Sequence, residues 1–252
     1  MKTVRAADGR LVYYNSGGSG KPIIMIHGAG SNHTTWLKTA HALKGMRWAA
    51  LDCRGHGLTQ GEPEIAATVA DIIAIADKEK MRSFIIAGIC MGGTMAMETA
   101  KLHPGRVNKI VIVSPFDKHL IAGASFLDLT CKTARALFPL VHKRRKLSYV
   151  DYRIPPKVPF IFTVIADCKG IHARHYGTAV LNCLHRRTTL ESTHAPLLVI
   201  SGTKDIFLRR DLLSARVSKN PQCTWIELDT NHHAITWKPK EVAQLISDFV
   251  KR

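Results

Sequence analysis

Short, mostly apolar runs alternate with helical patterns along most of this chain, and that alternation is the feature that most constrains its fold. Apolar residues recur at helical spacing over 69–76 and again over 242–249. Continuous apolar runs between such helices are typical of strands that are buried on both faces. The sequence therefore predicts an α/β fold, with a mostly parallel central sheet flanked by helices. The six runs that we expect to be strands are Ile23–Ile26, Trp48–Leu51, Phe84–Ala87, Ile110–Val113, Leu197–Ile200 and Trp225–Leu228.

The N-terminal segment predicts an antiparallel start to the sheet. Residues 3–7 and 10–14 are extended runs on either side of Asp8-Gly9, a dipeptide suited to a tight hairpin turn. The stretch from Asn15 to Gly20 that follows is rich in glycine and serine, and we expect it to be a flexible connection.

The alternation lapses between Asp117 and Ser192, where aromatic, proline and basic residues mix. We therefore expect a core domain formed by 1–117 and 191–252, with a mainly helical cap inserted at 118–190. The cap carries 13 Lys and Arg against 3 Asp and Glu, which is +10 of the chain's +17. Such an excess favours anionic partners through long-range attraction, although a solvated basic surface would have the same composition.

The overall composition fits one globular unit. The chain has 252 residues, of which 46% are hydrophobic and 22% charged. No signal-peptide pattern and no stretch of roughly 18 apolar residues is present, so we expect a soluble, cytoplasmic protein with no membrane span. The spacing of the six cysteines favours free thiols over a disulfide framework or a structural zinc site. They are Cys53, Cys90, Cys131, Cys168, Cys183 and Cys223.

One cysteine lies in a context that points to covalent chemistry. The segment Gly88-Ile89-Cys90-Met91-Gly92 follows an expected strand and precedes an Ala/Met-rich helical pattern. In a nucleophile elbow, small residues two positions on either side leave the nucleophile exposed on a sharp strand-to-helix turn. The N-terminus of the following helix also favours a thiolate. The alternative is a buried cysteine in a glycine-rich turn, which the strand, turn and helix together argue against.

At this point the sequence resembles the α/β-hydrolase family from about residue 10 to residue 250. The segment His27-Gly28-Ala29-Gly30 is similar to the family's oxyanion loop, and the segment over 52–57, Asp-Cys-Arg-Gly-His-Gly, is similar to its D-x-R-G-H-G turn. Most members carry serine where this chain has Cys90, but dienelactone hydrolases and polyhydroxyalkanoate synthases also carry cysteine. The resemblance implies an α/β-hydrolase fold and an enzyme that works through a covalent acyl intermediate.

The resemblance also implies roles for residues around Cys90. The main-chain N–H groups of Ala29 and Met91 are expected to form the oxyanion hole. His27 is expected to be structural, because the family's base comes late in the chain, and Arg54 and His56 are expected to stabilise the loop near the site.

The family order of nucleophile, acid and base is met by Cys90, Asp205 and His232. Asp117 is the alternative acid, since it also follows an expected strand. His232 is favoured over its neighbour His233 because it lies seven residues before Pro239, which is expected to open the last helix. Asn231, which tolerates left-handed backbone geometry, is expected to replace the glycine that usually precedes the base.

A cysteine nucleophile limits the range of acyl donors that we expect. An acyl-enzyme on Cys90 is a thioester, which forms readily from another thioester, an enol ester or a lactone, but not from an ordinary alkyl ester. We therefore expect an acyl-thioester hydrolase or acyltransferase, with acyl-CoA or an acyl carrier protein recognised through basic cap residues such as Arg144 and Arg145. The alternative is a carboxyl-ester or lactone hydrolase with the same triad.

A third possibility is a non-catalytic binding protein on the same scaffold, which could bind nucleic acid through 142–146. The full set of catalytic residues argues against it, and no basic groove with interleaved aromatics is evident, so no nucleic-acid partner is expected. No P-loop, dinucleotide motif or metal cluster is present in the sequence, so we expect neither a cofactor nor a metal.

Overall fold

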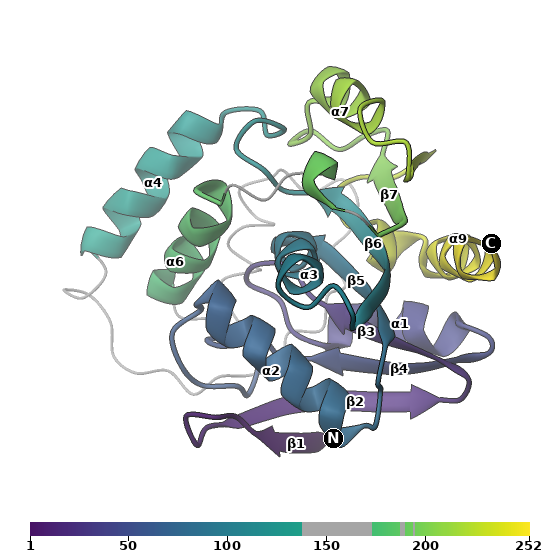
Figure 1. Cartoon of the computed structure of the whole chain (residues 1–252). Helices are drawn as coiled ribbons and strands as arrows, with labels where there is room; N and C mark the ends of the chain where they lie inside the picture. The colour runs from purple at the N-terminus through teal and green to yellow at the C-terminus, as the bar shows by residue number, and fades with distance from the viewer. Residues whose placement is uncertain (138–172, 187–189, 194) are drawn as a thin grey trace.

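A mixed sheet with the strand order β1-β2-β4-β3-β5-β6-β7-β8 forms the centre of the computed structural model, which describes residues 1–137, 173–186, 190–193 and 195–252 (Figure 1). The pairings of β1 with β2 and of β2 with β4 are antiparallel, and every later pairing in this order is parallel. The strands are β1 (Lys2–Arg5), β2 (Leu11–Gly18), β3 (Lys21–Ile26), β4 (Met46–Leu51), β5 (Phe84–Cys90), β6 (Val107–Pro115), β7 (Leu197–Gly202) and β8 (Cys223–Leu228). All six expected strands are therefore confirmed, and each is longer than expected.

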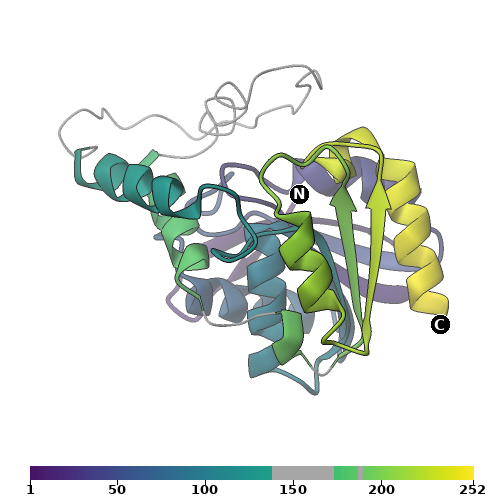
Figure 2. The same cartoon turned by 90° about the horizontal axis from the view of Figure 1, so that it is seen from above.

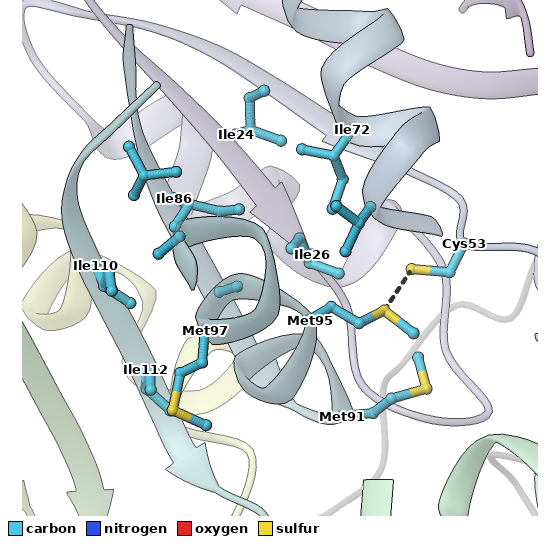
Figure 3. Close-up of a cluster of buried hydrophobic side chains, with 14 of the residues drawn as sticks. Ile24, Ile26, Cys53, Ile72, Ile86, Met91, Met95, Met97, Ile110 and Ile112 are labelled. Atoms are coloured by element: carbon cyan, nitrogen blue, oxygen red, sulfur yellow. Dashed lines mark hydrogen bonds between the residues drawn. The ribbon is translucent and has the colours of Figure 1, made fainter. Parts of the chain in front are cut away.

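Helices cover both faces of this sheet (Figures 1 and 2). On one face α2 and α3 pack against alternate strand residues such as Ile24 and Ile26, as Figure 3 shows for α3. On the other face α1, α8 and α9 pack against the intervening residues, such as Ile23 and Met25. Because both sets are buried in the central strands, β3 is apolar over Ile23–Ile26 and β5 over Phe84–Ala87. The helices are α1 (Thr34–Ala42), α2 (Ile65–Lys78), α3 (Met91–Leu102), α4 (Ala124–Leu137), α6 (Ala173–Leu184), α7 (Arg210–Val217), α8 (Ala234–Trp237) and α9 (Pro239–Lys251), and a 3₁₀ turn spans Leu190–Ser192.

The N-terminal hairpin is confirmed, but its second strand continues further than expected. Its loop places Gly9 at φ +82°, and the Ala6 N–H donates to the Arg10 carbonyl at 2.8 Å. The expectation of a flexible connection from residue 15 is wrong for 15–18, which belong to β2 and pair with β4. The small residues there make room for a neighbour, since a Cβ on Gly17 would lie 2.8 Å from the Trp48 ring.

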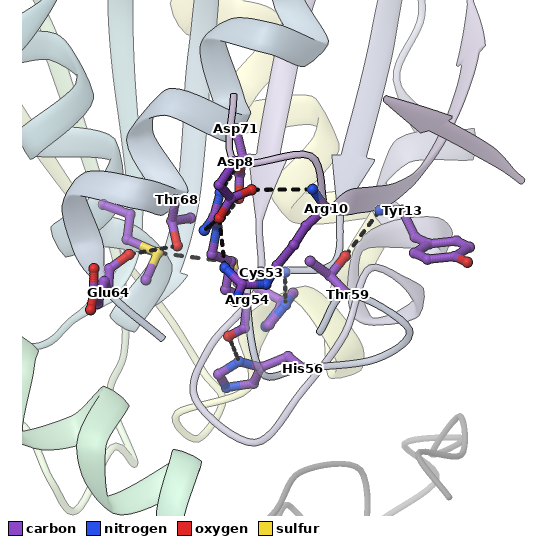
Figure 4. A network of polar contacts seen from close by, with 12 residues as sticks. Asp8, Arg10, Tyr13, Cys53, Arg54, His56, Thr59, Glu64, Thr68 and Asp71 are labelled. Carbon is purple, nitrogen blue, oxygen red and sulfur yellow. Dashed lines mark hydrogen bonds and ion pairs between the residues drawn. The ribbon is translucent and has the colours of Figure 1, made fainter. Parts of the chain in front are cut away.

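Polar contacts tie the hairpin loop to the turn that follows β4 (Figure 4). The Arg54 guanidinium donates to both carboxylate oxygens of Asp71 on α2, at 2.7 and 2.8 Å, and to Asp8 at 2.5 Å. Asp71 is almost fully buried, so this forked pairing supplies the partner that a buried carboxylate needs. Arg54 therefore has the stabilising role expected for it.

Two buried histidines support the loops that follow β3 and β4. The His27 Nε2 accepts a hydrogen bond from the Cys53 N–H at 3.0 Å, and the His56 Nδ1 donates to the Arg54 carbonyl at 2.9 Å. Both rings are fully buried. Burial lowers the pKa of His27 to about 4 and that of His56 to about 3. Both side chains are therefore neutral and structural at neutral pH.

The described parts of 118–190 include two helices that pack on each other, α4 and α6. The His185 ring contacts the Asp128 carboxylate at 2.7 Å, and Cys131 joins α6 residues in a small apolar cluster. Helix α6 is also fixed to the core, because Asn182 donates to the Pro63 carbonyl at 3.0 Å. The division into a core and a cap at 118–190 stays a prediction, since 138–172, with Arg144 and Arg145, lies outside the described residues. In the described ranges, no helix combines the length and apolar character needed to span a membrane.

Acidification is expected to destabilise the protein through its buried neutral histidines. A histidine with a depressed folded pKa contributes stability that is fully present above the unfolded pKa of about 6.5 and is lost as pH falls toward the folded value. For His56 the loss between about pH 6.5 and 4.5 should be on the order of 2 kcal/mol. Denaturant unfolding across this range should therefore show a steeper pH dependence for the wild type than for His56→Asn, whose amide can keep the bond to Arg54. Parallel pH profiles for the two proteins would contradict this account.

Candidate active site

The direction of strand addition reverses between β3 and β5, and the candidate site lies at the carboxyl ends of these two strands. The chain proceeds from β3 to β4 on one side and from β5 to β8 on the other. In open α/β sheets, such a switch point leaves a crevice in which ligands bind. Cys90 ends β5, and Gly28 follows β3 beside it, since a Cβ on Gly28 would lie 3.4 Å from the Cys90 Cβ.

The backbone at Cys90 has the geometry of a nucleophile elbow. Its φ of +53° is left-handed, which a residue with a side chain rarely adopts, and α3 begins at the next residue. The main chains of β3, β5 and α3 approach one another so closely here that glycine is needed two positions on either side of Cys90. A Cβ on Gly88 would lie 2.1 Å from the Gly92 carbonyl oxygen, and one on Gly92 would lie 2.3 Å from the Ile26 carbonyl oxygen. The two small positions expected from the sequence are thus required by packing.

The structure brings His232 and Asp205 together as expected. The His232 Nδ1 lies 2.8 Å from an Asp205 carboxylate oxygen, and the other oxygen accepts the Phe207 N–H at 3.0 Å. Burial disfavours the charged form of the ring, but the Asp205 carboxylate outweighs it and raises the pKa of His232 well above its ordinary value. Burial likewise opposes the charge on Asp205, but His232 holds the pKa of that carboxyl below its ordinary value. The pair is thus a buried, mutually stabilised acid and base.

Cys90 completes this arrangement from the other side of the ring. Cys90 lines the same cavity as His232 and contributes to the raised pKa of that histidine. Because Nδ1 is held by Asp205, Nε2 is the ring nitrogen left for Cys90. His233 differs, since burial and the neighbouring His232 lower the pKa of His233 to about 4. His232, and not His233, therefore stays our candidate for the base.

The alternative acid lies elsewhere. Asp117 accepts hydrogen bonds from the Arg216 guanidinium at 3.1 Å and from the His119 N–H at 2.7 Å. It is thus an ion-pair partner of α7 and does not orient the histidine.

The expectation for Asn231 is wrong. Among the described non-glycine residues, positive φ values occur at Lys80, Cys90 and Ser114, and not at Asn231. Its side chain instead accepts the His233 N–H at 2.9 Å. The main chain of this loop instead passes close to Gly202 at the end of β7. A Cβ on Gly202 would lie 2.5 Å from the Asn231 carbonyl oxygen.

The two residues expected to supply oxyanion donors, Ala29 and Met91, both lie near the nucleophile. Met91 is the first residue of α3, so its main-chain N–H has no acceptor within the helix. Ala29 lines the same cavity as Cys90, next to Gly28. Both N–H groups therefore stay our candidates for the oxyanion hole.

A small cavity opens above Cys90 and contains no Lys or Arg among its described lining residues. Most of its wall is apolar or aromatic, and its volume is about 70 Å³. The sequence interpretation missed most of this wall, because no local motif marks it. These side chains come from Ser31, Thr35, Ile89, Phe116, Leu127, Tyr176, Val180, Phe207 and His233.

The remaining cysteines and the other possible metal ligands form no second site within the described residues. The five cysteines within the described residues are free thiols, and Cys168 lies outside them. In the same part of the chain, no group of three or more His, Cys, Asp or Glu side chains is arranged to hold a metal ion. The segment 142–146 also lies outside the described residues. The expectations of no cofactor and of no nucleic-acid partner stay predictions.

Comparison with known proteins assigns the family. Residues 23–245 match the profile described as the Alpha/beta hydrolase family. The chain belongs to this family. A curated relative, the "Serine hydrolase-like protein" of Danio rerio, is 22% identical over 92% of this chain and 82% of its own length. Matches to several other curated proteins cover only 33% to 44% of those proteins.

Solved structures of this hydrolase fold resemble the whole chain. An esterase from Thermogutta terrifontis has a TM-score of 0.75 at 18% identity, and the match covers 99% of this chain and 97% of that one. The enol-lactonase from Burkholderia xenovorans LB400 has a TM-score of 0.73 at 20% identity, with complete coverage of both chains. At these identities the likeness confirms the expected fold alone.

Alkylation should distinguish Cys90 of this hydrolase from its other described thiols. Burial raises the pKa of Cys131 and of Cys223 to about 11, and raises those of Cys53 and Cys183 as well. At about pH 8 a thiol with such a pKa is a thiolate only about once in a thousand molecules. Peptide mass mapping after brief iodoacetamide treatment should therefore find Cys90 labelled first, and labelling should be slower in His232→Ala. Faster labelling of Cys223 would refute the assignment.

The two acid candidates are separated by matched amide substitutions. Asp205→Asn should lower kcat by about 10²- to 10⁴-fold, because the neutral amide no longer favours the imidazolium and no longer enforces the tautomer of His232. Asp117→Asn removes only the contact with Arg216 and should leave kcat within about twofold. Hydrolysis of a chromogenic aryl ester provides the measurement. A larger loss from Asp117→Asn than from Asp205→Asn would reverse the two roles.

Proposed function

We propose that this chain is a carboxyl-ester or lactone hydrolase that uses Cys90 as its nucleophile. The observation that carries the proposal is the small, mostly apolar cavity in which Cys90 and His232 meet. Its described lining residues include no Lys or Arg to pair with an anionic acyl group, and any charge on His232 is already matched by Asp205, so burial of an anionic acyl group there would be costly. A neutral acyl group suits this cavity, and its volume favours a short one.

In the proposed mechanism, the Cys90 sulfur attacks the acyl carbon while His232 takes the thiol proton. The carbonyl oxygen becomes an oxyanion, which the N–H groups of Ala29 and Met91 stabilise. The intermediate collapses with cleavage of the acyl carbon–oxygen bond, and His232 returns the proton to the leaving alcohol or enol. Water then attacks the thioester, with His232 again as the base, and Cys90 leaves as the thiol. Asp205 orients the ring and stabilises the imidazolium throughout.

The nucleophile selects among esters. The acyl-enzyme is a thioester, which is more energetic than an alkyl ester, so acylation is favourable only when the leaving group is also a good one. Enol esters, aryl esters and enol lactones meet this condition. The structural neighbours described as an esterase and as an enol-lactonase support this range, because their fold accommodates both reactions.

Acyl-thioester hydrolysis or transfer is the second candidate, with acyl-CoA or an acyl carrier protein as the donor. Its support is the basic composition of 118–190 together with the cysteine nucleophile, for which acylation from another thioester is nearly isoenergetic. The anionic part of such a donor would lie outside the cavity, so the apolar lining of the cavity does not argue against this candidate. A preference for aryl and enol esters over thioesters therefore decides between the two candidates.

A series of acetate esters with leaving groups of decreasing acidity tests the proposal. The wild type should hydrolyse aryl and enol acetates and lose kcat/KM steeply toward ethyl acetate, because formation of the thioester becomes uphill. Cys90→Ser should give a shallower dependence on the leaving group, since its acyl-enzyme is an oxyester, and Cys90→Ala should abolish turnover. Cys223→Ala, which changes a thiol on β8 outside the cavity, is the matched control and should behave as the wild type. A higher kcat/KM for acetyl-CoA than for every ester would favour the second candidate.

A further inference from the structure

Ser114 has a backbone conformation that its role in β6 does not require. Its φ is +49°, in the left-handed region that favours glycine, and the residue is fully buried. The pairing of β5 with β6 is irregular at this point, because Ile89 lies opposite Val113 whereas Cys90 lies opposite Pro115. Ser114 is thus an extra residue in a bulge directly beside the nucleophile. Bulges near active sites commonly redirect a side chain.

The redirected side chain reaches the histidine loop. The Ser114 Oγ donates a hydrogen bond to the main-chain carbonyl of His232 at 2.7 Å. The same end of β6 is held from the other side, where the Thr94 hydroxyl of α3 donates to the Phe116 carbonyl at 3.2 Å. The bulge therefore links the helix that carries the nucleophile elbow to the loop that carries the base.

We propose that Ser114 is a positioning residue, whose hydroxyl fixes the His232 main chain so that the ring stays between Asp205 and Cys90. The inference rests on the proposed function, since it assigns His232 the role of base. Asp205 contacts the ring only at Nδ1, and this contact alone does not fix the His232 main chain relative to β5. The contact from Ser114 restrains that backbone, and it comes from the strand adjacent to β5. A serine at a left-handed position, where glycine would be unstrained, is explained by this hydroxyl.

Two substitutions separate the hydroxyl from the backbone conformation. Ser114→Ala removes the hydroxyl and keeps a Cβ at φ +49°, whereas Ser114→Gly removes the hydroxyl and relieves the strain. If Ser114 served only to form the bulge, the reactivity of Cys90 in Ser114→Gly would equal or exceed that of the wild type. If the hydroxyl positions His232, both variants lose function. Should Ser114→Ala fail to fold, Ser114→Gly carries the test alone, because glycine adopts this conformation readily.

The test measures the rate of Cys90 alkylation by iodoacetamide as a function of pH, which reports proton transfer to His232 without any substrate. Both variants should alkylate about five- to tenfold more slowly than the wild type, an effect of the size of one hydrogen bond. In a His232→Ala background, the same substitutions should change the rate by less than about twofold, because the side chain through which Ser114 acts is gone. Turnover of an aryl ester should show the loss in kcat with KM unchanged. Ser247→Ala is the matched control, since that serine also donates to a main-chain carbonyl, on α9.

The inference would be overturned if Cys90 in Ser114→Gly were alkylated at the wild-type rate. It would also be overturned if the Ser114 substitutions lowered the alkylation rate equally with and without the His232 side chain. Failure of the proposed function has a different signature. In that case, Cys90→Ala would retain ester hydrolysis, whatever the Ser114 variants do.

Discussion

The left-handed backbone at Cys90 is the constraint on which the rest of the site depends. Such a conformation in a residue with a side chain costs about 1–3 kcal/mol and persists only where the surroundings enforce it. Here β3, β5 and α3 approach so closely that Gly88 and Gly92 have no room for a Cβ. The buried residues of α3, such as Met95, anchor that helix on the sheet. Core packing thus keeps Cys90 in its left-handed backbone conformation, and this conformation places the Cys90 side chain at the cavity.

The parallel half of the sheet explains how groups far apart in the sequence meet at this thiol. Consecutive strands β5, β6, β7 and β8 end at the same edge, and each supplies one group there. β5 ends with Cys90, β6 carries Ser114, the loop after β7 carries Asp205 and the loop after β8 carries His232. The base must reach back across two strands to the nucleophile. Its loop is accordingly held at several points, by Asp205 at the ring, by Ser114 at the main chain and by the close approach of Gly202.

The sequence was sufficient for those features that short-range signals specify. The elbow depends on glycines two positions from Cys90 and could be placed from the local sequence. Asp205 and His232 are named from the order of the family that the sequence resembles, and the structure places them in contact. The pairing of 15–18 with β4 could not be placed from the local sequence, because it depends on how Trp48 covers Gly17 from another strand. The roles of Asn231 and Ser114 depend in the same way on contacts that only the assembled loops create. The cavity wall draws side chains from most of the chain's length, and no local pattern predicts such a set.

The surroundings of Cys90 determine how charge can be stabilised in the proposed reaction. No Lys or Arg is found among the described residues of the cavity wall, and the buried His233 is neutral at neutral pH because its pKa is lowered to about 4. The charge that develops on the substrate oxygen must then be met by main-chain N–H dipoles and by the His232–Asp205 pair. In an apolar, weakly screening cavity such dipoles act more strongly than they would in water. Within the proposed reaction, the same cavity would penalise an anionic acyl group, which would lose its hydration without gaining a Lys or Arg partner, since His232 is already paired with Asp205. In this proposal the basic excess of 118–190 would act on the approach of an anionic partner, whereas the lining of the cavity would favour a neutral acyl group.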